Sequence, residues 1–96
     1  MASYDKKDKK RRQDSENGHD HVLILHNDDV NTFDNVIDAL VTFCDHDNIQ
    51  AEQCATLAHY LGSCEIKRGT LPDLLEIHKM LTAQSLKVSI HQLIGP

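Results

Sequence analysis

Three polar residues in a row follow a short apolar run and could carry chemistry. The run covers residues 22–25, and Asn27, Asp28 and Asp29 come one residue after it. A histidine, His59, lies further along the chain, beside Tyr60. An amide oxygen, carboxylates and an imidazole acceptor suit an ammonium group, which offers three donors and no acceptor. These residues therefore predict a site for an amine, provided that the fold brings them together.

The same residues also fit simpler explanations, and one catalytic one. An Asn-Asp-Asp run is typical of a turn, because these side chains bond to nearby backbone. A histidine on a helix is often a structural residue with its hydrogen bonds satisfied. Asp28 or Asp29 could also pair with His59 as the base and its orienter in a small acid–base hydrolase. No nucleophile, oxyanion loop or glycine-rich phosphate cradle accompanies them in the sequence, so we expect a protein that is not an enzyme.

A metal site and a nucleic-acid surface fit the sequence less well. The chain has seven histidines and three cysteines, Cys44, Cys54 and Cys64, but no spacing typical of zinc. The odd cysteine count also argues against a disulfide framework. A basic cluster runs from Lys6 to Arg12, yet the net charge of the chain is -5, which disfavours binding to nucleic acid. We expect no metal, no cofactor and no nucleic-acid partner.

The composition limits the size and the surroundings of the folded part. The chain has 96 residues, 40% of them apolar and 4% aromatic, which predicts one small domain with an aliphatic core. No apolar run approaches the roughly 20 residues that cross a bilayer. Residues 1–20 lack the apolar stretch of a secretory signal, so we expect a cytoplasmic protein without membrane contact. Their dense charge predicts a disordered polar extension, and residues 21–96 then form the domain.

Six elements must position the polar residues. The apolar run 22–25 predicts a buried strand. Asn31 or Thr32 can cap a helix whose apolar face, at helical spacing, is Phe33, Val36, Ile37, Leu40 and Cys44. Asn48 can cap a second helix, which carries small residues and ends at Gly62.

The second half of the chain carries patterns for a strand, a helix and a last strand. Residues 64–67 alternate as a strand does, and Thr70 with Pro72 opens a third helix. The face predicted to be buried on that helix is Leu71, Leu74, Leu75, His78 and Leu81. Leu86, Val88 and Ile90 alternate in a last strand. The order strand-helix-helix-strand-helix-strand predicts an α+β fold, a two-layer domain with a three-stranded sheet and helices packed on one face.

The segment from His21 to Gly62 resembles the ClpS family, the adaptors of Clp proteases that recognise N-degrons. The resemblance is carried by Asn27-Asp28-Asp29 after the apolar strand, and by Val36-Ile37-Asp38 and Leu40 on the next helix. Ala51, His59-Tyr60 and Gly62 keep the spacing of the family without a gap. The resemblance implies a cytoplasmic adaptor that delivers N-degron substrate proteins to a Clp AAA+ unfoldase, ClpA-like or ClpC-like.

The resemblance also implies roles for single residues. In the family a pocket holds the first residue of a substrate, normally Leu, Phe, Tyr or Trp. Carried over by position, Asn27 and His59 would bind the α-ammonium group, and Asp28 and Asp29 would add negative potential or act through water. The wall of the pocket would consist of Asn31, Phe33, Val36, Ala55, Ala58 and Leu86. Phe33 and Ala55 stand where the family usually has Met, and Ala58 where it usually has Val.

Overall fold

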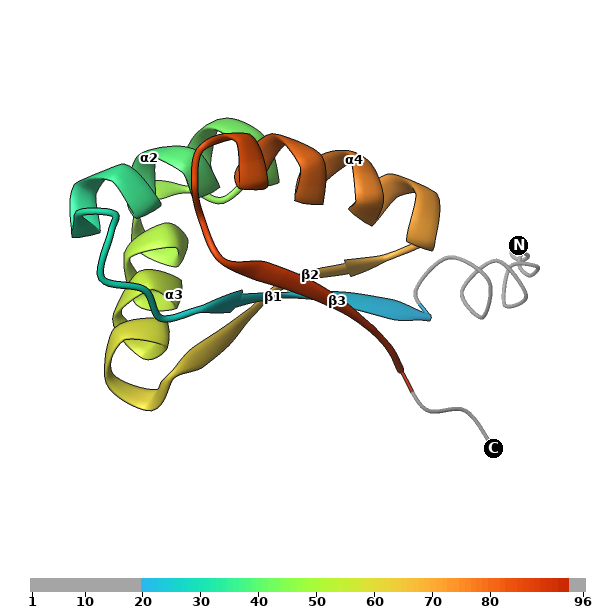
Figure 1. Cartoon of the computed structure of the whole chain (residues 1–96), viewed down its shortest axis with the longest axis horizontal. Helices are drawn as coiled ribbons and strands as arrows, with labels where there is room; N and C mark the ends of the chain where they lie inside the picture. Colours follow the sequence, from blue (N-terminus) through green and yellow to red (C-terminus); the bar gives the residue numbers. More distant parts are fainter. Residues whose placement is uncertain (1–19, 94–96) are drawn as a thin grey trace, which may run out of the picture.

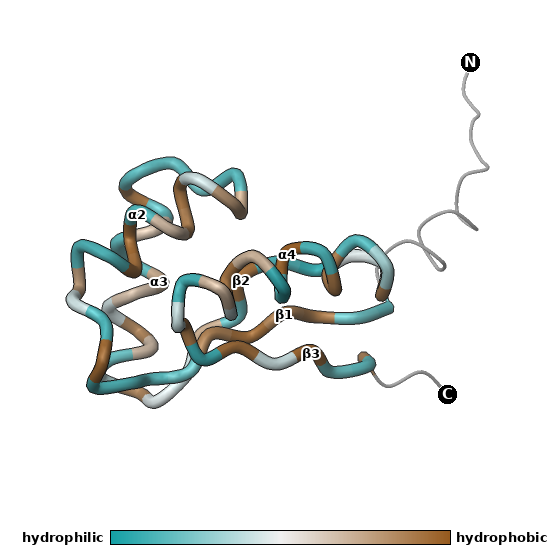
Figure 2. Tube along the Cα trace, turned by 45° about the horizontal axis from the view of Figure 1, so that its top comes forward, coloured by the Kyte–Doolittle hydropathy of each residue, from teal (hydrophilic) through white to brown (hydrophobic). Residues whose placement is uncertain are grey.

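The computed structural model describes residues 20–93 as a three-stranded antiparallel sheet covered by helices. The sheet order is β2-β1-β3, so β1 (His21–His26) lies between β2 (Ser63–Gly69) and β3 (Val88–Gln92). The hydrophobic stretch of β1 therefore forms the centre of the sheet (Figure 2). The expected disordered extension, apart from residue 20, lies outside the described residues.

Three helices complete the domain in the predicted order. Figure 1 shows α2 (Phe33–Cys44) and α4 (Leu71–Ala83) over the same face of the sheet, with α3 (Asn48–Leu61) at one end. Helix α3 contacts α2, β2 and β1, and it thus joins the two layers at that end. The predicted α+β fold and its two-layer arrangement are confirmed. Among these three helices, none has the length and hydropathy needed to span a membrane.

The helix ends follow from local sequence. Thr32 caps α2 by accepting a hydrogen bond from the Asn35 backbone N–H at 3.1 Å, which settles the choice between Asn31 and Thr32. Gly62 ends α3 at φ 99°, a left-handed conformation that glycine adopts without strain. The prediction that Asn48 caps α3 is wrong. Asp47 is the cap, because its Oδ1 accepts from the Gln50 N–H at 2.7 Å.

Helix α4 begins with a hydroxyl cap that we expect to contribute measurably to stability. Thr70 Oγ1 accepts from the Asp73 N–H at 3.2 Å. Thr70→Ala should therefore lower the free energy of unfolding by about 0.5–2 kcal/mol, measured by urea denaturation. Thr70→Ser keeps the acceptor and should restore most of the loss. Thr82→Ala, on the exposed surface of the same helix, is the control; an equal loss there would exclude the cap as the cause.

The core is aliphatic and lies between the sheet and the helices. Its fully buried large residues are Leu23, Leu25, Leu40, Leu74 and Leu81. On α4 the core face is Leu74, Ile77 and Leu81, whereas Leu71 and Leu75 are 40% and 51% exposed. The predicted face of this helix was therefore wrong in part, because both stripes have helical spacing and only packing distinguishes them.

Two further details concern the ends of elements, and the first differs from expectation. Leu86 precedes β3 instead of belonging to it, and its backbone N–H bonds to the Leu81 carbonyl at 3.1 Å. His46, in the connection between α2 and α3, is 6% exposed and its Nε2 donates to the Ile66 carbonyl at 3.0 Å. Ile66 is skipped in the pairing of β2 with β1, so His46 anchors the α2–α3 connection to an irregularity in the sheet.

Candidate functional site

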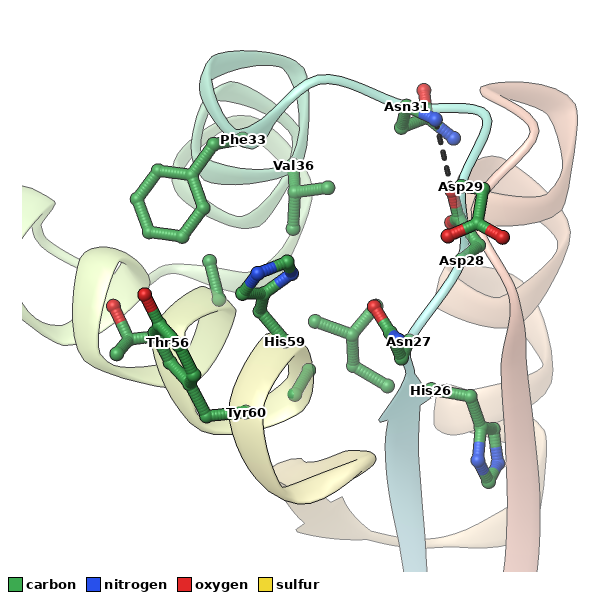
Figure 3. Close-up of a pocket in the computed structure, with 13 residues that line it drawn as sticks. His26, Asn27, Asp28, Asp29, Asn31, Phe33, Val36, Thr56, His59 and Tyr60 are labelled. Atoms are coloured by element: carbon green, nitrogen blue, oxygen red, sulfur yellow. Dashed lines mark hydrogen bonds between the residues drawn. The ribbon is translucent and has the colours of Figure 1, made fainter.

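A pocket of about 690 Å³ opens where the end of β1, the start of α2 and the second half of α3 meet (Figure 3). The chain leaves β1 at His26 and passes directly beside the end of α3, because the Asn27 N–H donates to the Gly62 carbonyl at 3.0 Å. That bond fixes Asn27 next to the last turn of the helix that carries His59. The residues lining the pocket are Leu25, His26, Asn27, Asp28, Asp29, Asn31, Phe33, Val36, Ala55, Thr56, Ala58, His59 and Tyr60.

The loop that follows Asn27 is held by its own side chains. Asp28 Oδ1 accepts from the backbone N–H groups of Val30 and Asn31, both at 2.8 Å, which makes a tight turn. Asn31 Nδ2 donates to the Ser85 carbonyl at 2.7 Å and ties the loop to the segment before β3. The predicted turn chemistry is therefore real, and it orders the loop that forms one rim of the pocket.

Asn27 and His59 approach the same space from two elements. Figure 3 shows the Asn27 side chain directed toward His59 across the pocket, with Asp28 and Asp29 on the loop above. Both Asn27 and His59 are exposed, so neither is a buried structural residue. The His59 ring packs edge-on against Tyr60, with centroids 4.7 Å apart and an interplanar angle of 83°. This contact restricts the orientation of the imidazole at the rim.

The rim is rich in acceptors and negative charge. Asp28 and Asp29 form no salt bridge with any residue in the described range 20–93. One carboxylate oxygen of Asp28 accepts both turn bonds. Its other oxygen forms no hydrogen bond within this range. Uncompensated carboxylates close to amide and imidazole acceptors favour a cation, since charge-assisted hydrogen bonds are stronger than neutral ones.

The interior of the pocket is apolar. Ala55 and Ala58 are 4% and 3% exposed and belong to the face of α3 that packs inward. Val36 and Phe33 approach from α2, and Figure 3 shows Phe33 at the outer side of the pocket. Phe33 is 41% exposed, so the expectation that it belongs to the buried face of its helix was wrong.

Leu86 does not line this pocket. It is 4% exposed in the core and borders a separate hollow of about 240 Å³ between α2 and the end of α4. The physical reason is its position before β3, where its backbone bonds to the last turn of α4. Leu25, His26, Thr56 and Tyr60 line the pocket and were missed. Their spacing gave no sign of this, although Tyr60 adjoins His59 in the sequence.

The arrangement suits the binding of an amine that carries an apolar group. Within residues 20–93 no hydrogen bond joins His59 to Asp28 or Asp29, so the geometry does not support the hydrolase alternative. Cys44 and Cys54 are poor nucleophile candidates, because burial raises the pKa of Cys44 to about 11 and also raises that of Cys54. Residues 20–93 contain no cluster of three or more side chains suited to binding a metal ion.

The fold is a small α+β domain, and its site is an apolar pocket with hydrogen-bond acceptors at the rim. The family of ATP-dependent Clp protease adaptor protein ClpS matches residues 16–92. The chain therefore belongs to the ClpS family and has the family's role as a Clp protease adaptor. This match extends well beyond the segment 21–62 on which the resemblance rested.

Solved structures share the fold. One match is the structure of Agrobacterium tumefaciens ClpS2 bound to L-phenylalaninamide, with a TM-score of 0.72 and 17% sequence identity. The match covers 75% of this chain and 94% of the Agrobacterium chain. Among curated proteins, none matches this chain in sequence.

Proposed function

We propose that this protein binds substrates through their first residue, a Leu, Phe, Tyr or Trp with a free α-amino group. It then delivers them to a Clp AAA+ unfoldase for degradation. The proposal rests on one observation. Asn27 and His59 lie beside Asp28 and Asp29 at the rim of the same apolar pocket. The ammonium group binds at this rim, and the side chain of the first residue fills the pocket below it.

Two free-energy terms give the site its preference for chain ends. Burying a side chain the size of Leu or Phe contributes roughly 1.5–3 kcal/mol. Hydrogen bonds to a charged group contribute about 1.5–3 kcal/mol each. An internal Leu brings no ammonium group, so the acceptors of Asn27 and His59 stay unpaired when it enters. The second term thus distinguishes an N-terminal residue from the same residue elsewhere in a chain.

The ligand of the structurally similar Agrobacterium protein has the matching chemistry. L-phenylalaninamide, which that protein binds, combines an apolar ring, an α-amino group and an amide in the place of a peptide bond. Our proposal requires these three features of a substrate. The wall that receives the ring consists of Phe33, Val36, Ala55 and Ala58, with Asn31 at the loop side.

Membership of the ClpS family supports a Clp unfoldase as the partner. We propose that this unfoldase is ClpA-like or ClpC-like and that the encounter takes place in the cytoplasm. Residues 21–96 form the adaptor domain in this proposal, and residues 1–20 form an extension that takes no part in the pocket.

Blocking the α-amino group of a substrate is the direct test of this function. A fluorescent peptide that begins with Leu should bind the protein, and fluorescence polarisation should report saturation. The same peptide acetylated at its N-terminus should bind at least about 100-fold more weakly, since two charge-assisted bonds are lost. Equal binding of the two peptides would contradict recognition of the N-terminus.

A further inference from the structure

The outward face of α3 exposes three large apolar side chains. Ile49 is 69% exposed, Leu57 44% and Tyr60 77%. With 3.6 residues per turn, Ile49, Gln53, Thr56, Leu57 and Tyr60 fall on one side of the helix. The opposite side holds the small buried residues, so the exposed apolar side chains lie on the face that the core does not use. An exposed apolar stripe of this kind is typical of an interaction surface.

The stripe is continuous with the pocket. Thr56 lines both the main pocket and a second, shallow hollow of about 430 Å³. The residues that form this second hollow are Ile49, Glu52, Gln53, Thr56 and Leu57. Tyr60 and Thr56 stand at the edge of the main pocket nearest this face (Figure 3). A chain that leaves the pocket on this side therefore passes directly onto the apolar stripe.

The other rim of the pocket offers no such surface. It is the loop of Asn27, Asp28, Asp29 and Asn31, whose polar groups surround the site for the ammonium. A downstream segment would meet a single exposed apolar side chain there, Val30, and no continuous stripe. Phe33 on α2 is another apolar edge of the pocket, but the edge on α3 continues through Thr56 into a hollow that includes Ile49 and Leu57.

We propose that the outward face of α3 is an extended subsite that binds the substrate residues following the N-terminal one. This proposal rests on the proposed function of the pocket. From Tyr60 to Ile49 the helix rises about 16 Å, the length of roughly five residues of extended chain. The subsite thus takes residues 2 to about 7 of a substrate and favours apolar side chains at the positions that meet Leu57 and Ile49.

A leucine scan tests the subsite. The reference peptide begins with a free Leu followed by serines, and each variant replaces one serine between positions 2 and 7 by Leu. The wild-type protein should bind the best variants about three- to tenfold more tightly than the reference. Leu57→Gln should remove the gain at position 3 or 4, and Ile49→Gln the gain at position 6 or 7. The pairing of peptide position with protein variant is a double-mutant cycle.

Leu75→Gln is the matched control, because Leu75 is also an exposed leucine but lies on α4. It should keep every gain of the scan. If the reference peptide binds but the scan is flat, or if Leu57→Gln and Ile49→Gln behave as the control does, the subsite is overturned while recognition of the N-terminus stands. If the reference peptide does not bind, the proposed function itself fails, and the subsite with it.

Discussion

Replacing either Asn27 or His59 by alanine should weaken the binding of a peptide with a free N-terminal Leu by about 10- to 150-fold. Each substitution removes one hydrogen bond to the ammonium group, worth about 1.5–3 kcal/mol. The fold should survive, because both side chains are exposed and neither forms a hydrogen bond within residues 20–93. Fluorescence polarisation measures the affinity, and circular dichroism checks the fold.

Matched substitutions away from the pocket separate this effect from a general one. Asn48→Ala at the start of α3 and His91→Ala in β3 remove the same residue types from exposed positions outside the pocket. Both variants should bind the Leu peptide as the wild type does. Near-normal affinity of both the Asn27 and the His59 variants, with unchanged circular dichroism, would exclude these residues as the ammonium site.

The double substitution adds information about cooperation between the two acceptors. If Asn27 and His59 bind one ammonium group, removing the second acceptor should cost less binding free energy than removing the first. The ammonium group is then no longer held in its original position by both residues. The free energies of the two single variants would then not add. Full additivity would indicate that the two residues contact different parts of the peptide.

The order of the elements could be predicted because local signals agree with the fold. The apolar run 22–25 lacks the amphipathic spacing of a surface helix. Thr32 and Thr70 mark helix starts by their hydrogen bonds, and Gly62 marks a helix end by its backbone angle. What failed was the choice between two stripes on α4, where Leu71 and Leu75 compete with Leu74 and Leu81. Periodicity gives the spacing of a face, but only contact with the sheet decides which face is buried.

The site was less accessible from the sequence than the fold. Asn27 and His59 are 32 positions apart in numbering, and the bond from the Asn27 N–H to Gly62 that brings them together involves only backbone. No side-chain pattern reports such a bond, so the pairing depended on family resemblance. The resemblance placed Leu86 in the pocket wall and alternation placed it in a strand, whereas a backbone bond to Leu81 holds it in the core.

Tyr60 and Thr56 are pocket residues that the sequence pattern did not predict. Both lie on the face of α3 opposite its small buried residues, and both line the pocket. The buried residues of α3 are small, and the Asn27 N–H bonds to the Gly62 carbonyl at the end of that helix. Ala51, Ala55 and Ala58 are each nearly inaccessible, so the helix lies close to its neighbours. The shape of the pocket is thus a consequence of packing.

Substituting Phe33 by alanine should change which first residues the pocket accepts. Phe33 begins α2 and is 41% exposed at the outer side of the pocket, whereas Ala55 and Ala58 form a wall of short side chains deeper in. We therefore expect the pocket to be narrow at its mouth and wide at its base. Ile and Val carry their branch at Cβ, close to the peptide backbone, where the ring of Phe33 stands. Leu, Phe, Tyr and Trp carry their bulk further out and pass the ring.

A misfit methyl group in an apolar pocket typically costs about 1–3 kcal/mol, or roughly 10–200-fold in affinity. The wild-type protein should discriminate against peptides beginning with Ile or Val by a factor in this range, relative to Leu. Phe33→Ala should reduce that factor, because the ring that meets the Cβ branch is gone. Phe33→Met should fall between the two, since a flexible thioether can move aside where a rigid ring cannot.

The test is a set of identical peptides that begin with Leu, Phe, Trp, Ile or Val, titrated against the three proteins. The ratio of Ile to Leu affinity is the measured quantity, because it cancels any loss of apolar contact that all peptides share. A gain in absolute affinity for Ile in Phe33→Ala would strengthen the assignment further. If the wild type binds Ile as tightly as Leu, or if both variants leave the ratio unchanged, Phe33 does not restrict the mouth. Selectivity would then have to arise from the deeper wall at Ala55 and Ala58.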